Sequence, residues 1–327
     1  MNKTKKNYIR EIRESLGYPL DQISGFTEIP IERLKAIESG DEATLAELRD
    51  IAFVLGVSTR ALLGDGGVFS SHQAGGTCIL LEGRMSTVSS FWGHIGILLH
   101  NSDKYLWFPI TSETSEIVCR VCDQPRFCIP CMNNKVLYVN RSCVKDMILL
   151  NDDCDPAYYA NWDPNVSDGE IPLVVYESLG DFMSGEGDDE EIMSKKFQKM
   201  LDNFVDEKKL SEEDMTEMTL TSVIHYKDGK TGYANIDFGF CYENISEDIR
   251  MMSMFEDYEY LNDILYFVST EGAQHHLVAD NVSMLEMPLL KLEDAVLKKR
   301  SRSWRFLKQT KNLYIGEGVK FNSFVAI

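Results

Sequence analysis

The most constraining feature of the chain is a series of short amphipathic segments over its first 64 residues. Apolar residues recur there at helical spacing, and glycines stand where helices would have to end. Pro30 suits the first turn of a helix, and Ser58 suits a helix N-cap. The pattern predicts five helices, near residues 8–16, 20–24, 30–38, 45–55 and 58–63.

These segments resemble a known DNA-binding domain. The stretches "IREIRESLGYPLDQIS", "IPIERLKAIESG" and "TLAELRDIAFVLGVSTRALL" are similar to the five-helix domain of the lambda-repressor/Cro family, also called the xenobiotic-response-element family. Residues 1–64, about a fifth of the chain, carry the likeness. It rests on Arg13, Ile23, Leu34 and Ile37, on the Glu38-x-Gly40 ending and on the closing "LGVS…LL". The resemblance implies a helix-turn-helix whose third helix faces DNA.

The resemblance also implies which side chains would contact DNA. Ile31, Glu32 and Ala36 fall at positions that face base edges, where a glutamate can accept from cytosine and an aliphatic group can touch a thymine methyl. Neither makes the two-bond contacts of arginine with guanine or glutamine with adenine. Cations remain for the phosphates, namely Arg33, Lys35, Lys3, Lys5 and Lys6. We therefore expect weak binding per subunit that depends on a dimer.

Two positions depart from the family pattern. Leu20 stands where the family usually has a phosphate-contacting glutamine, and Glu28 stands where its tight turn usually has glycine. Because a glutamate adopts positive φ less easily than glycine, we expect the turn to use another conformation. An alternative interpretation is a helical module that contacts protein and no longer recognises DNA.

The distribution of charge limits where nucleic acid could bind. The net charge is −19, but residues 1–64 contain nine Lys/Arg and ten Asp/Glu, so about −18 belongs to the remainder. An acidic body repels polyanions over about 8–10 Å at moderate salt. Contact must therefore be local. The basic run 298–311 is a second candidate, although it could equally neutralise the acidic body of the same chain.

Residues 77–160 are rich in short strand-like segments. "FWGHIGILLH" and "YLWFPIT" predict a hairpin, and "EIVCRV", "RFCIPC", "KVLYVN" and "VKDMILL" predict further strands. A meander of this kind suggests a small barrel of Sm-like topology. An acidic segment with an apolar helical stripe follows near residues 192–204.

A second stretch resembles the first. Aligned without gaps, residues 135–150 match residues 275–290, with Leu137 opposite Leu277 and Met147 opposite Met287. Duplication of a β-rich module would explain the match, and shared strand–turn patterning is the alternative.

The expected fold is therefore α+β and multidomain, with a helical bundle followed by a larger β-rich domain of duplicated small barrels and inserted helices. The predicted parts are a helix-turn-helix domain at 1–64, a linker at 65–76, a β-rich module at 77–160, an acidic helical insertion at 161–215, a second β-rich module at 216–296 and a basic segment at 297–327.

The cysteines include candidate metal ligands. Two Cys-x-x-Cys pairs lie five residues apart, a spacing that would need a tight knuckle to bind zinc. Semi-buried cysteines on strands are the favoured interpretation, so no metal or cofactor is expected. The candidates, should a metal bind, are Cys119, Cys122, Cys128 and Cys131.

No catalytic motif emerges from the sequence. HExxH, GxxxxGK[ST] and GxSxG patterns are all missing, so no enzyme is predicted. No apolar run reaches the roughly 18 residues of a membrane helix, and the N-terminus lacks a signal peptide. The hypothesis is a cytoplasmic, homo-oligomeric transcription regulator or repressor that binds double-stranded DNA and whose acidic domain senses an unknown ligand, contacts a partner or oligomerises. The alternative is an interaction scaffold.

Overall fold

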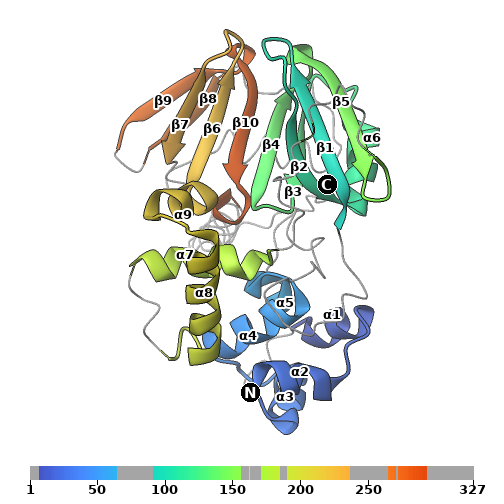
Figure 1. Ribbon diagram of the computed structural model, residues 1–327, viewed down its shortest axis with the longest axis vertical. Helices are drawn as coiled ribbons and strands as arrows, with labels where there is room; N and C mark the ends of the chain where they lie inside the picture. The colour runs from blue at the N-terminus through green and yellow to red at the C-terminus, as the bar shows by residue number, and fades with distance from the viewer. Residues whose placement is uncertain are drawn as a thin grey trace, which may run out of the picture.

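A computed structural model describes residues 7–64, 91–155, 162, 171–184, 190–235, 264–269 and 272–292 of the chain. Helices and sheets are mixed, with N-terminal helices followed by a strand-rich region (Figure 1). The strands gather at one end of the molecule, and the first five helices lie at the other. None of the described helices combines the length and the apolar character needed to cross a membrane.

Five helices form where the amphipathic pattern predicted them. Thr44 and Glu47 make a reciprocal capping box at the start of the fourth helix, and the side chain of Ser58 accepts from the amide of Ala61 at the fifth. Gly56 and Gly64 end these two helices in left-handed conformation. The helices are α1 (Ile9–Ser15), α2 (Leu20–Thr27), α3 (Ile31–Glu38), α4 (Leu45–Leu55) and α5 (Thr59–Leu63).

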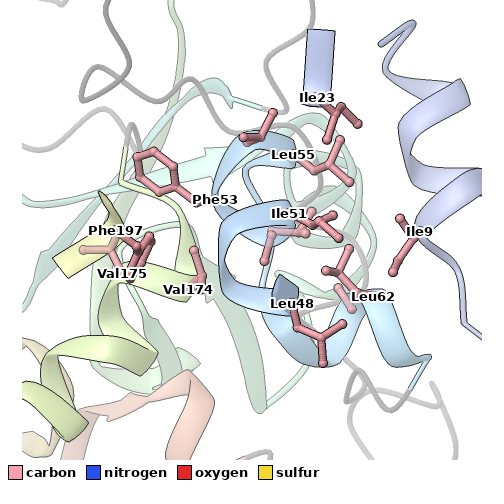
Figure 2. Packing of buried hydrophobic residues seen from close by; sticks show 14 of the residues in the cluster. Ile9, Ile23, Leu48, Ile51, Phe53, Leu55, Leu62, Val174, Val175 and Phe197 are labelled. Carbon is pink, nitrogen blue, oxygen red and sulfur yellow. The ribbon is translucent and has the colours of Figure 1, made fainter. Parts of the chain in front are cut away.

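Three later helices complete the core of this bundle. They are α7 (Leu173–Ser184), α8 (Lys195–Lys208) and α9 (Glu212–Thr219). One apolar cluster contains residues from α1 to α5 together with Val174 and Val175 of α7 and Phe197 of α8 (Figure 2). The rings of Phe53 and Phe197 pack edge to face, with centroids 5.4 Å apart. Residues 7–64 therefore share their core with a segment more than a hundred residues away.

Polar contacts reinforce this shared core. The buried guanidinium of Arg49 on α4 donates to the carboxylate of Asp181 on α7 and, at 3.0 Å, to the carbonyl of Ile192. At α5, the amide and hydroxyl of Thr59 both donate to Glu177 Oε2, at 3.1 and 3.0 Å. Leaving the charge of this buried arginine without a carboxylate would cost free energy. The pair with Asp181 therefore fixes where α7 lies, in addition to the burial of its apolar side chains.

The strand-rich region begins with five strands and one helix. β1 pairs antiparallel with both β2 and β5, and β3 pairs antiparallel with β4. A short 3-10 helix joins β4 to β5. The elements are β1 (Phe91–Leu99), β2 (Leu106–Thr111), α6 (Ser112–Val121), β3 (Arg126–Cys131), β4 (Lys135–Asn140), the 3-10 helix (Arg141–Cys143) and β5 (Val144–Asn151).

The same pairing recurs in the next five strands. β6 pairs with β7 and with β10, β8 pairs with β9, and a 3-10 helix joins β9 to β10. The elements are β6 (Thr221–Tyr226), β7 (Thr231–Asn235), β8 (Ile264–Val268), β9 (Gln274–Val278), the 3-10 helix (Ala279–Asn281) and β10 (Val282–Pro288).

The two sets of strands join edge to edge. β4 pairs antiparallel with β10, with Val139 opposite Met284 and Lys135 opposite Pro288, giving a five-stranded sheet in the order β3-β4-β10-β6-β7. The two 3-10 helices begin at Arg141 and Ala279, which are 138 positions apart, whereas the predicted gapless match pairs residues 140 apart.

One predicted strand is wrong. "EIVCRV" forms the second half of α6, because the side chain of Thr111 caps a helix by accepting from the amide of Thr114. Val118 and Val121, three residues apart, then face the core, while Glu116 and Arg120 face solvent. The β-branched residues indicated a strand, but the N-cap and the helical spacing of the buried residues favour a helix.

One predicted domain boundary, at 215/216, falls inside α9, and the second strand set begins at β6. The predicted helical insertion packs on α4. The predicted linker 65–76 and basic segment 297–327 lie outside the described residues.

We predict that α4 and α8 unfold together. Phe197→Ala should lower the free energy of unfolding by about 3–5 kcal/mol, because it removes an aromatic side chain from the shared core. Amide hydrogen exchange should accelerate in α4 as well as in α8. Tyr233→Ala, at a side chain that is 68% exposed, is the control and should change stability by under about 0.5 kcal/mol. Wild-type protection of α4 in the Phe197 variant would contradict a shared core.

Candidate nucleic-acid interface

Helix α2, a short turn and α3 follow one another in the order that the sequence suggested, but the turn differs from expectation. Glu28 adopts a left-handed conformation with φ of 63°, so the expectation of a turn without positive φ is wrong. The hydroxyl of Ser24 donates to the carbonyl of Ile29 at 2.7 Å and closes the turn. A glutamate in this conformation costs about 1 kcal/mol, which the burial of Ile29 and of Ile23 in α2 offsets.

The outer face of α3 is open to solvent among the described residues. Leu34 and Ile37 point into the core, while Ile31, Glu32 and Lys35 are exposed. In Figure 1, α2 and α3 lie at the end of the molecule opposite the sheets. This face therefore combines an exposed apolar side chain with one charge of each sign.

Both cations of α3 are paired with carboxylates. The guanidinium of Arg33 makes two bonds to Glu47, with Nε–Oε1 at 2.8 Å and a terminal nitrogen to Oε2 at 2.7 Å, and it also donates to the carbonyl of Glu42. The hydrogen bond from Arg33 is the largest of the effects that lower the pKa of Glu47. Lys35 pairs with Glu32 at 2.8 Å on the exposed surface, where such pairs are weak. Lys35 can therefore leave its partner far more easily than Arg33 can.

The other proposed contacts are placed less favourably or are outside the described residues. Ala36 is half-buried on α3. Lys3, Lys5 and Lys6 precede residue 7, where the described part of the chain begins. Arg13, which the family pattern singled out, donates to Glu38 Oε1 at 2.6 Å and to the carbonyl of Tyr18 at 3.0 Å. This pair holds α1 against the end of α3, so it supports the position of α3.

The four candidate metal-binding cysteines do not converge. Cys119 is exposed and Cys122 half-buried at the end of α6, whereas Cys128 and Cys131 are buried on β3. Cys128 and Cys131 belong to different apolar clusters, because residues three apart on a strand face opposite sides. Burial raises the pKa of the Cys131 thiol well above its ordinary value. Within the described residues, no three side chains of metal-binding type come together.

Sequence reasoning missed Asp50, a half-buried carboxylate where α4 meets α8. The hydroxyl of Ser194, the N-cap of α8, donates to Asp50 Oδ1 at 2.8 Å. Burial raises the pKa of Asp50 to about 6, against the opposing effect of the Ser194 bond and of Lys196. Lys196 itself pairs with Glu28 in the turn at 3.0 Å. Helix α8 is thus connected to α4 through a hydrogen bond and to the turn between α2 and α3 through an ion pair.

Comparisons with protein-family models, with curated proteins and with solved structures show no match for this chain.

We predict that Asp50 lowers stability at neutral pH. Since its folded pKa lies above the ordinary value of 3.8, the folded state holds the proton more tightly, and stability falls as pH rises from about 4 to about 6. Asp50→Asn cannot ionise, yet its amide oxygen can still accept from Ser194.

The Asn variant should therefore be more stable than the wild type by about 1–2 kcal/mol at pH 7, and equal to it near pH 4. Urea unfolding at the two pH values measures the difference. Asp202→Asn, an exposed site on α8, controls for the change in net charge. An equal gain at both pH values would show that the carboxylate's ionisation is not the cause.

Proposed function

We propose that this chain is a DNA-binding regulator whose α2–α3 unit docks on duplex DNA with low affinity per subunit. The observation that carries this proposal is the open outer face of α3, with Ile31, Glu32 and Lys35 exposed and the inner face held by the core. A helix presented in this way can enter a major groove. Lys35 would contact phosphate after leaving Glu32.

Weak binding follows from the charges around α3. Arg33 is committed to Glu47, and Arg13 to Glu38, so few cations of the described bundle are available to displace counterions from DNA. Two subunits sharing one site would double the phosphate contacts. The proposal therefore includes a homo-oligomer, with the lambda-repressor-like bundle as its DNA-binding part and a cytoplasmic location.

We further infer that residues 91–151 and 221–288 are two copies of a small barrel of Sm-like topology. Each set has a first strand between the second and fifth, a third paired with a fourth, and a 3-10 helix between the fourth and fifth. Four shared features in the same order, three strand pairings and one 3-10 helix, are more than shared strand–turn patterning explains. This strand-rich body would provide oligomerisation, ligand sensing or partner binding.

A second candidate is an interaction scaffold in which α3 contacts protein. The Arg33–Glu47 pair favours it, because the guanidinium that could have contacted phosphate is held by a carboxylate of the same chain. The exposed apolar Ile31 at the start of α3 also suits a protein contact.

A salt titration of the full chain against random and genomic duplex DNA tests the proposal. Glu32→Gln removes a negative charge from the docking face and frees Lys35, so we expect about two- to tenfold tighter binding near 50 mM salt and less gain at higher salt. Glu213→Gln on α9, exposed and away from α3, is the matched control and should change nothing.

Deleting residues 1–64 would not serve as a control, because the deletion would remove most of the shared core. If the full chain shows no salt-dependent binding near 50 mM, or if both glutamine variants gain equally, DNA docking by α3 is wrong and the scaffold takes its place.

A further inference from the structure

Helix α6 ends with two cysteines on consecutive turns. Cys119 belongs to its last turn, and Cys122 is the C-cap, still in helical conformation with φ of −64° and ψ of −13°. Helix geometry places Cα atoms three residues apart at a separation of about 5 Å, within the range of about 4.4–6.8 Å that a disulfide spans. Because α6 ends before Cys122, the side chain of Cys122 can move toward Cys119 without disturbing a further helical turn.

The two thiols differ in their access to solvent. The Sγ atom of Cys122 lies 4.0 Å from the carbonyl oxygen of Cys119, so it is directed back toward the preceding turn of the helix. Cys119 is exposed, whereas Cys122 is half-buried. A reagent in solution therefore reaches Cys119 first, with the second thiol next to it.

The charges around this helix end are balanced. Arg141 donates from Nε to the carbonyl of Cys122 at 3.0 Å, and the exposed Arg120 adds a second positive charge. Glu116 and Asp123, both exposed, supply the two negative charges that are close in sequence. The chain as a whole has a net charge of −19. An anionic reagent can therefore approach this helix end more easily than it can approach the acidic surface elsewhere.

We propose that Cys119 and Cys122 form a reversible disulfide by exchange with a small anionic disulfide of the glutathione type. The Cys119 thiolate attacks one sulfur of the reagent, and one glutathione thiolate leaves. The Cys122 thiolate then attacks the Cys119 sulfur of the mixed disulfide, and the second glutathione thiolate leaves. Two protein thiols are oxidised to one disulfide, and the reagent is reduced to two glutathione thiols that take up the two protons.

This bond would be easy to reverse. The loop that it closes runs only from Cys119 to Cys122, so it restricts the unfolded chain little, and an external thiol can reopen it. Helix α6 lies in the strand-rich region, at the other end of the molecule from α3 (Figure 1). The inference therefore goes beyond DNA docking and does not rest on it.

Peptide mapping of the full chain tests the proposal. The reduced, folded protein is incubated with glutathione disulfide, alkylated and digested with trypsin. Trypsin cleaves after Arg120, between the two cysteines, so their disulfide appears as peptide 105–120 linked to peptide 121–126. We expect this linked pair to be the main oxidised form of Cys119, and dithiothreitol to remove it. Cys119 found mainly as a free thiol, as a lasting mixed disulfide or bound to another cysteine overturns the proposal.

Substitution of Cys122 isolates the first step of the exchange. In Cys122→Ser no neighbouring thiol displaces the glutathione, so the mixed disulfide at Cys119 should be at least about tenfold more abundant than in the wild type. Cys154→Ser is the matched control, because Cys154 is also exposed but lies outside α6, and it should give the wild-type amount of the linked pair. An unchanged mixed disulfide in the first variant, or loss of the linked pair in the second, would show that Cys122 is not the resolving thiol.

Discussion

Burial of α4 on all its sides is the constraint on which the rest of the structure depends. One side of the helix packs on α2 and α5, and another receives α7 and α8, so nearly all of its residues are removed from solvent. A helix with eight of its eleven residues buried cannot stand at the surface of a separate domain. The N-terminal bundle is therefore built into the molecule, and the guanidinium of Arg49 fixes how α7 lies against α4.

Electrostatics gives this bundle its particular character. Its arginines are used mainly to join its own helices, as Arg33 does with Glu47 and Arg13 with Glu38. Bidentate pairs between a guanidinium and a carboxylate hold their geometry far better than a lysine on the surface does. The bundle thus gains rigidity from cations that a strong DNA-binding protein would present outward. The low affinity per subunit in the proposed function rests on this use of the arginines.

Local features of the fold could be predicted from the sequence, because caps and helical spacing act over a few residues. The five helices of the bundle and the β1–β2 hairpin follow from such signals. The packing of α7 on α4 and the pairing of β4 with β10 join residues more than a hundred positions apart, and no local pattern specifies them. For the same reason the sequence named Arg33 but could not show that Glu47 holds it. The sequence did not indicate Asp50, because its burial depends on the packing of α8 against α4.

Helix α7 explains how the bundle and the sheets act as one body. Its residues divide between two cores, with Val174, Val175 and Leu179 packed against α4, and Leu173 and Tyr176 packed with residues of β10. Rotation of the bundle relative to the sheets would expose one of these apolar faces to water, at a cost of about 1.5–3 kcal/mol for each large side chain. Any signal from the strand-rich body of the proposed regulator would therefore differ from the release of a tethered domain. It would have to reach α3 through small shifts of packed helices.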